Sequence, residues 1–504
     1  MFYVQQDLPD LCQIYQYSDF YVKGDCMILV HSGVTAGIEG FLIDVEVDIR
    51  PGLPGFEIVG LPSKTVRESR ERVRSALLNS GFKFPAQKVI VNLAPAHYPK
   101  DGALFDLPIA LGILAHQGVL PPSVFRHAIF AGELSLSGRL KRINGVLSLA
   151  KLAAASSLGF IFPAANASEA ALIQGNRYYL ADSLLHAIDI LAGRAAPSLY
   201  PQGKLPKHQE WVGKEIKGQQ LAKRALEIAA HGGHHIMLIG PPGVGKTLLA
   251  TAARHLLPPL SHEEILVVNK IYEAAGVLGS QGSPITERPF RTPHHSISQA
   301  GLVGSKSGRP GEITLAHLGV LLLDEFPEFN QGALQGLREP LDHKKIQLSR
   351  AEHTITYPAD FWLIATANPC PCGYFGSEVR LCTCSTRDIN RYRRKLRGPL
   401  LDRFDIFTYL SPLTEQELRQ ATIPWPQRGT RGQNGKRQVP AATSEALDFL
   451  YQAQHKLELS VRGFEKTRKL AGTIAELDGD ARIQTRHMAE ALQYRFENYR
   501  YLFG

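Results

Sequence analysis

Three short apolar runs mark the middle of the chain, at residues 236–239, 319–323 and 361–367. Each is followed at once by glycine-rich or polar residues. Continuous apolar runs of this length are typical of parallel strands that are buried on both faces of a sheet. The segment 247–254, which follows the first run, is rich in helix-forming residues. The pattern therefore predicts an α/β unit with a parallel sheet.

The pattern changes on either side of this unit. Toward the N-terminus, residues 38–49 and 89–93 predict strands, and 64–80 predicts a helix with Arg67, Arg70 and Arg74 on one side. Toward the C-terminus the periodicity is helical, and a basic, glycine-rich loop interrupts it. The predicted C-terminal helices are 441–458, 462–478 and 485–498, and the basic loop is 428–437.

These changes divide the chain into parts. Residues 1–26 are rich in glutamine and tyrosine and differ in composition from residues 27–504, so we hypothesise that the protein starts at Met27. A proline-rich polar stretch is typical of a linker. We therefore expect an N-terminal extension at 1–27, an α/β domain at 28–195, a linker at 196–212, a second α/β domain at 213–412 and a C-terminal helical domain at 413–504.

The loop after the first apolar run has the G-x-x-x-x-G-K-[ST] pattern of a phosphate-binding loop. Glycines without a Cβ let backbone N–H groups approach phosphate oxygens, and the helix after the loop adds its N-terminal dipole. A lysine then reaches the β- and γ-phosphates, and a hydroxyl binds Mg²⁺. The predicted ATP-binding residues are Gly240, Pro241, Pro242, Gly243, Val244, Gly245, Lys246 and Thr247.

Polar residues that end the other apolar runs complete a predicted ATPase site. Asp324 is expected to hold Mg²⁺ with Thr247, and Glu325 to polarise the attacking water. Asn368 ends a strand that we expect beside the carboxylate strand, where its amide can orient that water.

Two arginines lie later in the chain. Arg403 can reach a neighbouring subunit's γ-phosphate as an arginine finger, and Arg462 can sense the γ-phosphate from the C-terminal helices. A structural role stays open for both, and for Arg403 it would be an ion pair with Asp402 or Asp405.

Four of the six cysteines lie within fifteen residues, as Cys370, Cys372, Cys382 and Cys384. The turn-rich sequence around them favours a fold around a tetrahedral Zn²⁺. Zinc sites more often use a C-x₂-C spacing, so a loop of reduced thiols and a redox disulfide both stay open.

The net charge is +9 with 44% hydrophobic residues, which fits a globular protein with an acidic partner such as nucleic acid. No apolar run reaches the length of a membrane span and no secretory signal is evident, so we expect a cytoplasmic protein. Cations in loops can hold phosphates without reading bases. The candidates for DNA contact are His294, His295, Lys306, Arg309, Lys344, Lys345 and Arg350.

Longer motifs run along most of the chain. Besides the phosphate-binding loop, they are 52–62, 72–82, 91–95, 105–110, 289–295 (Pro-Phe-Arg-Thr-Pro-His-His), 310–317, 368–373 (Asn-Pro-Cys-Pro-Cys-Gly) and 398–405 (Gly-Pro-Leu-Leu-Asp-Arg-Phe-Asp). In these motifs the chain, from about residue 28 to 504, resembles the Mg-chelatase-like AAA+ proteins of the ComM (YifB) family.

The resemblance implies a homo-hexameric ring with ATP and Mg²⁺ between subunits and Arg403 acting in trans. It also implies a motor that drives branch migration of DNA in natural transformation. Two alternatives stay open: a chelatase-like or protein-remodelling motor that ignores DNA, and a binding module with slow ATP turnover. The DNA structure, direction of movement and ring size are not given by the sequence.

The N-terminal domain resembles the Lon protease fold. Lon-type proteases place a serine nucleophile in a Lys-Asp-Gly-Pro-Ser motif, where this chain has Lys100-Asp-Gly-Ala-Leu104. The position of the partner lysine falls near Leu147, and Lys151 lies one helical turn further. Because a Ser–Lys dyad needs both groups, we expect a Lon-like domain without protease activity.

Overall fold

The structure is a computed structural model of the 504-residue chain. It describes residues 27–100, 102–170, 172–173, 177–196, 215–278, 284–349, 354–376, 380–395, 400–419, 425 and 439–495. The N-terminal extension, the basic loop 428–437, Arg350 and nearly all of the predicted linker lie outside these residues. No helix of the described part is long and apolar enough to cross a membrane.

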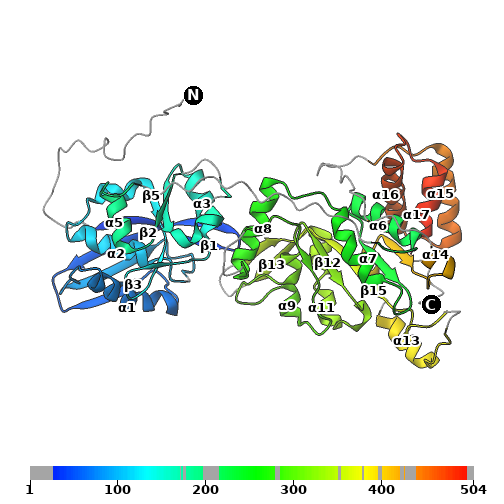
Figure 1. The fold of residues 1–504 in the computed structure, drawn as a ribbon, viewed down its shortest axis with the longest axis horizontal. Coiled ribbons are helices and arrows are strands. Elements are labelled where there is room, and N and C mark those ends of the chain that lie inside the picture. The colour runs from blue at the N-terminus through cyan, green and yellow to red at the C-terminus, as the bar shows by residue number, and fades with distance from the viewer. Residues whose placement is uncertain are drawn as a thin grey trace. The chain divides into compact units, whose positions relative to one another are not determined.

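The chain forms two compact units (Figure 1). Unit 1 contains Met1–Pro206 and Tyr272–Pro284, and unit 2 contains Lys207–Ile271 and Ile285–Gly504. The division into an N-terminal domain, an ATPase domain and a C-terminal helical domain stays a prediction.

Unit 1 is built on a four-stranded sheet of order β1-β2-β4-β3, in which only β3 and β4 are parallel. The alternation of buried and exposed residues along β2 and β4 follows from their one covered face. Both strands were predicted within one residue of their bounds. The strands are β1 (Ile28–Ala36), β2 (Glu39–Arg50), β3 (Gly55–Val59) and β4 (Lys88–Ala94).

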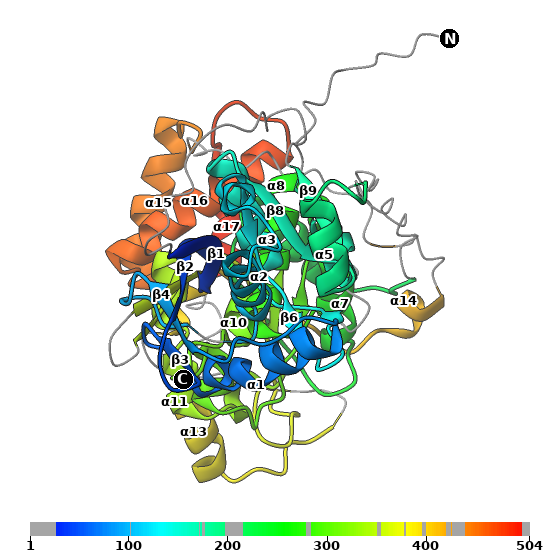
Figure 2. The same cartoon turned by 90° about the vertical axis from the view of Figure 1, so that its left-hand side faces the viewer.

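The described residues of unit 1 also form a three-stranded parallel sheet, a two-stranded antiparallel sheet and several helices (Figure 2). The predicted helix at 64–80 is confirmed as α1, and Arg67, Arg70 and Arg74 are exposed on it. The remaining elements are α1 (Lys64–Asn79), α2 (Asp106–His116), η1 (Pro122–His127), β5 (Ala128–Phe130), β6 (Glu133–Leu134), β7 (Leu140–Lys141), α3 (Val146–Ala155), β8 (Gly159–Pro163), η2 (Ala164–Asn166), α4 (Ala167–Ala170), β9 (Tyr178–Ala181) and α5 (Leu184–Leu191).

Helix α2 is the core of unit 1, since its residues from Asp106 to Ala115 are all buried. The buried Asp106 carboxylate accepts a hydrogen bond of 2.7 Å from Arg72 Nε, which joins α1 to α2. At the positions that correspond to the Lon nucleophile and lysine, Leu104 and Leu147 are buried apolar side chains. The absence of protease activity stays a prediction.

Unit 2 contains the predicted parallel sheet, with five strands in the order β11-β12-β15-β10-β16. The three central strands are buried along their whole length, as their apolar runs predicted. Strand β15 lies between β12 and β10, which confirms that the run at 361–367 pairs beside the carboxylate strand. The strands are β10 (Ile236–Ile239), β11 (Phe290–Arg291), β12 (Val320–Leu323), β15 (Trp362–Ala367) and β16 (Ile406–Tyr409).

Helices and one antiparallel hairpin surround this sheet. The predicted helix at 247–254 is confirmed as α7, and the hairpin consists of β13 (Lys345–Ser349) and β14 (Thr354–Pro358). The other elements before the C-terminal helices are α6 (Gln220–Gly232), α7 (Lys246–Ala253), η3 (Arg254–Leu256), α8 (His262–Ala275), α9 (Gln299–Val303), α10 (Glu312–Leu315), η4 (Phe326–Glu328), α11 (Gln331–Gln335), α12 (Arg338–His343), α13 (Thr386–Lys395), η5 (Leu401–Arg403) and α14 (Glu415–Arg419).

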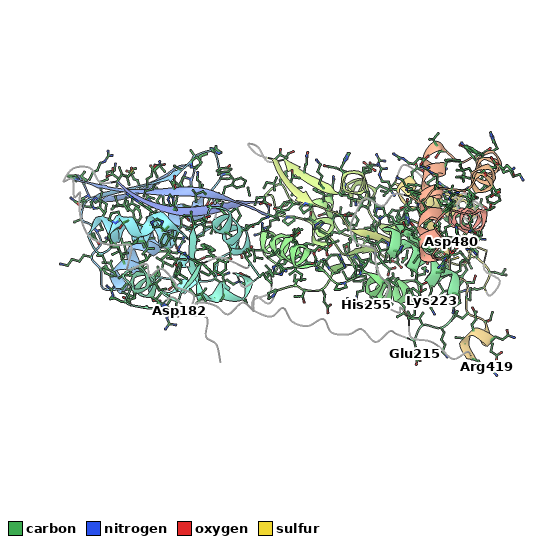
Figure 3. All side chains as sticks on the ribbon, turned by 90° about the horizontal axis from the view of Figure 1, so that it is seen from above. Asp182, Glu215, Lys223, His255, Arg419 and Asp480 are labelled. Atoms are coloured by element: carbon green, nitrogen blue, oxygen red, sulfur yellow. The ribbon has the colours of Figure 1, made fainter. Side chains whose placement is uncertain are left out.

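The C-terminal helices pack into the same hydrophobic core as the sheet. They are α15 (Ser444–Leu457), α16 (Val461–Leu477) and α17 (Thr485–Gln493), so the third predicted helix ends five residues early. Asp480, labelled in Figure 3, accepts a hydrogen bond from Arg486 and pairs with His487 in the turn between α16 and α17. Lys223 on α6 is buried, and its Nζ donates to the Ile216 carbonyl at 2.6 Å.

Candidate ATP and metal sites

The phosphate-binding loop connects the C-terminal end of β10 to the first residue of α7. Gly243 and Gly245 have φ values of +83° and +92°, in the left-handed region where a residue with a Cβ is strained. Apart from the glycine and its two neighbours in the chain, no residue has an atom within 4 Å of the position that a Cβ would occupy at either glycine. The glycines therefore serve the backbone turn, and they leave open space where phosphates would approach the helix N-terminus.

Lys246 is the first residue of α7, and its ammonium group is held at the mouth of this loop. Nζ donates to the carbonyls of Gly240 and Pro241 at 2.7 and 2.8 Å and to Asn368 Oδ1 at 2.9 Å. Burial lowers the pKa of Lys246 to about 8, although the carboxylates of Asp324 and Glu325 oppose this shift. The structure thus brings Lys246 and Asn368, two of the predicted catalytic side chains, into direct contact.

The Thr247 hydroxyl faces the Asp324 carboxylate, with Oγ1 3.1 Å from Oδ2. Asp324 is also held by Thr366 Oγ1 from the neighbouring strand β15. A hydroxyl and a carboxylate that converge in this way are oxygen ligands of the kind that Mg²⁺ prefers. The residues present therefore fit a Mg²⁺ ion beside the phosphate loop.

Glu325 has φ +55°, which is uncommon for a residue other than glycine. Its backbone N–H donates to Thr366 Oγ1 at 3.0 Å, and its side chain is 57% exposed. His295 approaches it, with Nδ1 3.8 Å from Glu325 Oε2. The strained backbone directs an exposed carboxylate away from the strand, where water can reach it.

Arg403 lies at the other edge of the sheet. It is the last residue of η5 and lies three residues before β16. Strand β16 runs parallel to β10, so the C-terminal ends of both strands lie at the edge of the phosphate loop. Arg403 precedes β16 and therefore lies at the opposite, N-terminal edge. Four strand residues at about 3.3 Å each separate the two edges by roughly 13 Å. Arg403 Nε donates to Asp342 Oδ1 at 3.1 Å. The hydrogen bonds described for Arg403 thus go to Asp342, whereas the structural alternative had named Asp402 or Asp405 as its partner.

Arg462 joins this second cluster. It is exposed in the first turn of α16, and one turn later Lys466 Nζ lies 2.7 Å from Asp405 Oδ1. The hydrogen bond from Arg403 holds the pKa of Asp342 below its usual value, and the charge of Arg462 adds to this effect. Both predicted arginines therefore gather around Asp342.

The DNA-contact candidates occupy different environments. His294 is exposed, and its Nδ1 lies 2.8 Å from Ser296 Oγ, whereas His295 faces Glu325. Lys344 Nζ pairs with Asp360 Oδ2 at 3.0 Å, and Lys345 is exposed on β13.

The other two cations lie on a tight turn against the hairpin. The Tyr357 hydroxyl of β14 donates to the Gly308 carbonyl of this turn at 2.8 Å. Lys306 and Arg309 on the turn are exposed. Exposed cations from two neighbouring segments therefore lie on one part of unit 2.

The four clustered cysteines converge as predicted. Their sulfur atoms all lie within 4.8 Å of one another, and Cys370 is buried while the others are partly exposed. All four are free thiols. The cluster is compatible with a metal ion.

Sequence reasoning missed three residues of these sites. Thr366 holds Asp324 and Glu325, Asp342 holds Arg403, and the buried Tyr392 hydroxyl interacts with the backbone N–H of Asn368. A lone threonine in an apolar strand was a signal for the first. Asp342 and Tyr392 become partners only through the tertiary fold, so no local pattern marks them.

A phosphate-binding loop, a threonine–aspartate pair and an adjacent glutamate at one edge of a parallel sheet define the site of a P-loop ATPase. Comparisons with known proteins place the chain in a family of such ATPases. The models "Magnesium chelatase, subunit ChlI", "Subunit ChlI of Mg-chelatase" and "Magnesium chelatase, subunit ChlI C-terminal" match residues 213–418, 45–166 and 415–495.

Whole-length relatives narrow the family. The chain is 39% identical to competence protein ComM of Haemophilus influenzae, over 93% of this chain and 97% of that protein. It is 38% identical to the uncharacterized protein YifB of Escherichia coli, over 93% and 96%. Lon protease 2 of Bacillus subtilis is 28% identical over 28% of this chain and 27% of its own, which supports the Lon-like N-terminal fold. The chain belongs to the ComM/YifB family of Mg-chelatase-like AAA+ ATPases.

Proposed function

We propose that this chain forms a hexameric ring that couples ATP hydrolysis to sequence-independent remodelling of branched DNA. The observation that carries the proposal is the separation of the phosphate loop and Arg403 to opposite edges of one parallel sheet. A single subunit then has two incomplete halves of an ATP site. A ring, in which the arginine edge of one subunit meets the phosphate loop of the next, completes every site.

The residues at the phosphate-loop edge have distinct roles in this proposal. Lys246 leaves Asn368 and the loop carbonyls to bind the β- and γ-phosphates. Thr247 and Asp324 hold Mg²⁺, which when bound offsets the negative charge of the phosphates. Glu325 accepts the proton of the water that attacks the γ-phosphorus, and the released Asn368 amide orients that water.

Arg403 and Arg462 act on the nucleotide of the neighbouring subunit. Both lie at the edge away from their own Lys246, and both lie near Asp342. Guanidinium groups that reach the γ-phosphate from outside stabilise the charge that develops as the bond to the β-phosphate breaks.

DNA is the proposed partner because of the whole-length similarity to a competence protein and because of exposed cations. Lys306, Arg309 and Lys345 come from two packed segments of unit 2, a geometry that suits contact with phosphates rather than bases. Because chromosomal and incoming DNA are in the bacterial cytoplasm, the proposal places this protein there.

The decisive experiment is ATP turnover by the purified protein with no DNA, with linear duplex and with branched DNA, beside Lys246→Ala. We expect branched DNA to stimulate turnover and Lys246→Ala to remove it, after which a strand-exchange assay tests branch migration. Turnover that ignores every form of DNA would contradict the DNA part and favour a protein-remodelling or chelatase-like motor. Lys306→Ala/Lys345→Ala should weaken DNA binding and its dependence on salt.

A further inference from the structure

The four-cysteine cluster has the spacing of a zinc site. The sulfur of Cys370 lies 3.3 Å from that of Cys372 and 3.7 Å from that of Cys382, and the sulfurs of Cys372 and Cys382 are 3.5 Å apart. Four thiolates bound tetrahedrally at a Zn–S distance of about 2.3 Å would lie roughly 3.8 Å apart. A bond between two of these sulfurs would need a separation of about 2.0 Å. The arrangement therefore suits one shared cation better than a disulfide.

Backbone donors support the same interpretation. The Cys372 N–H donates to Cys384 Sγ and the Phe375 N–H donates to Cys370 Sγ, both at 3.3 Å. Donors that point at sulfur favour the thiolate, which is the form that binds metal. The segment that returns after Cys372 passes through Gly373, whose φ is +85°.

This loop contacts the ATP site at two points. At Gly373 a Cβ would lie 2.4 Å from Pro242 Cδ, so the cysteine loop packs directly on the phosphate loop. At the other point, Asn368 stands two residues before Cys370, and its amide oxygen accepts from Lys246. The buried Tyr392 hydroxyl of α13 interacts with the Asn368 backbone N–H.

Helix α13 is itself fixed to the cysteine loop. The Arg393 guanidinium lies over the Phe375 ring, 4.6 Å from its centroid. The cysteine loop and α13 thus contact both the phosphate loop and Asn368. An ion bound by all four sulfurs would join the segment at Cys370 and Cys372 to the segment at Cys382 and Cys384.

We propose that Cys370, Cys372, Cys382 and Cys384 bind one Zn²⁺, and that the closed loop braces Asn368 and the phosphate loop for ATP. This inference rests on the proposed ATP hydrolysis for its purpose. The thiols release their protons as they bind the ion, and no oxidation is involved. Removal of zinc loosens Pro242 and Asn368 together and weakens ATP binding.

The test uses full-length protein purified without chelator. Zinc content is measured by mass spectrometry, and the affinity for ATP by calorimetry. We expect one zinc per chain in the natural protein and in Cys12→Ser/Cys26→Ser, a matched control that changes two thiols outside the cluster. Cys372→Ser removes one of the four ligands, so it should lose zinc. We expect it to bind ATP about tenfold more weakly, because even changes that only surround metal ligands commonly lower activity by that factor.

Gly373→Ala keeps all four ligands, but it places a methyl group against Pro242 and strains the backbone at φ +85°. Zinc content and the melting transition are therefore measured beside ATP affinity. We expect it to retain zinc and a cooperative melting transition, yet to bind ATP several-fold more weakly. Co²⁺ exchanged into the site should show the intense visible absorption of tetrahedral thiolate coordination. That spectrum should be kept in Gly373→Ala and lost in Cys372→Ser.

Three results would overturn the inference: no zinc in the natural protein, unchanged ATP affinity in zinc-free Cys372→Ser, or unchanged affinity in Gly373→Ala. Failure of the proposed function looks different. If the natural protein binds ATP but does not hydrolyse it, or hydrolyses it without regard to DNA, zinc content and ATP affinity still decide whether the brace exists.

Discussion

The two edges of the parallel sheet in unit 2 contain different sets of polar residues. At the C-terminal edge, Lys246 is hydrogen-bonded to Asn368, and Thr247 to Asp324, within one site. At the N-terminal edge, Arg403 is paired to Asp342, and no phosphate-binding loop lies at this edge in the described residues. The first edge contains the candidate ATP site, and the second contains Arg403 and Arg462 near Asp342.

The direction of the parallel strands explains which residues meet at each edge. Parallel strands place all their C-terminal ends at one edge, so residues that follow strands meet there and residues that precede strands meet at the opposite edge. While Arg403 is hydrogen-bonded to Asp342, its side chain cannot also reach across roughly 13 Å of strand to the phosphate loop of its own subunit. We infer that the second edge serves another subunit.

The largest expected effects come from the C-terminal edge. Lys246→Ala should abolish measurable ATP binding and turnover, because it removes the cation that the loop presents. Glu325→Gln should keep ATP binding but lower turnover by about 10²–10⁴, the usual size for a general base. Calorimetry and a phosphate-release assay separate the two. A glutamine variant that hydrolyses ATP at the normal rate would remove Glu325 from its assigned role.

Arg403→Ala should lower turnover by about 10³ while ATP affinity stays nearly unchanged, because an arginine finger acts on the transition state. Mixing it with Lys246→Ala subunits sharpens the comparison. Mixed rings contain some interfaces with an intact Lys246 on one side and an intact Arg403 on the other, so part of the turnover should return.

The matched control is Arg419→Ala, since Arg419 is an exposed arginine of the same unit (Figure 3) that pairs one turn away with Glu415. It should leave turnover unchanged. If mixed rings of the two inactive variants stay inactive although they assemble, Arg403 does not act across subunits.

The sequence predicted the C-terminal edge well, because that site is made of local patterns. An apolar strand, a glycine loop and a helix start are adjacent in the chain, and so are β12, Asp324 and Glu325. The partner of Arg403 at the N-terminal edge was not predicted. Arg403 meets Asp342, 61 residues away, only because α12 and η5 end at the same side of the sheet. Pairings of this kind depend on tertiary contacts, and so does the contact between Gly373 and Pro242.

The pH dependence of ATP affinity should report on Lys246 at the C-terminal edge. Burial lowers the pKa of Lys246 to about 8, and bound phosphates favour its charged form. Affinity should therefore be constant below pH 8 and fall above it by up to about tenfold per unit, because Lys246 must then take up a proton to bind ATP.

Calorimetry from about pH 6.5 to 9.5 measures this dependence, and Lys246→Arg is the control, because its guanidinium stays charged throughout. The slope above pH 8 should disappear in that variant. Equal slopes in both proteins would assign the titration to another group.

The smallest expected effect is that of Asp342→Asn. Asp342 is 39% exposed, and partly exposed ion pairs contribute about 0–1 kcal/mol, so the melting temperature should hardly change. The change removes the carboxylate that accepts hydrogen bonds from Arg403 at the N-terminal edge. Turnover should shift less than about fivefold, which is the scale of about 1 kcal/mol. ATP affinity at the C-terminal edge should stay the same.

A double-mutant cycle decides whether that shift acts through Arg403. In the Arg403→Ala background, Asp342→Asn should have no further effect on turnover, since the group that it releases is absent. Asp360→Asn is the control, because Asp360 lies at the same edge but pairs with Lys344. Its effect should be the same with and without Arg403. If Asp342→Asn instead changed turnover by the same factor with and without Arg403, as expected for Asp360→Asn, its carboxylate would not act by positioning the arginine.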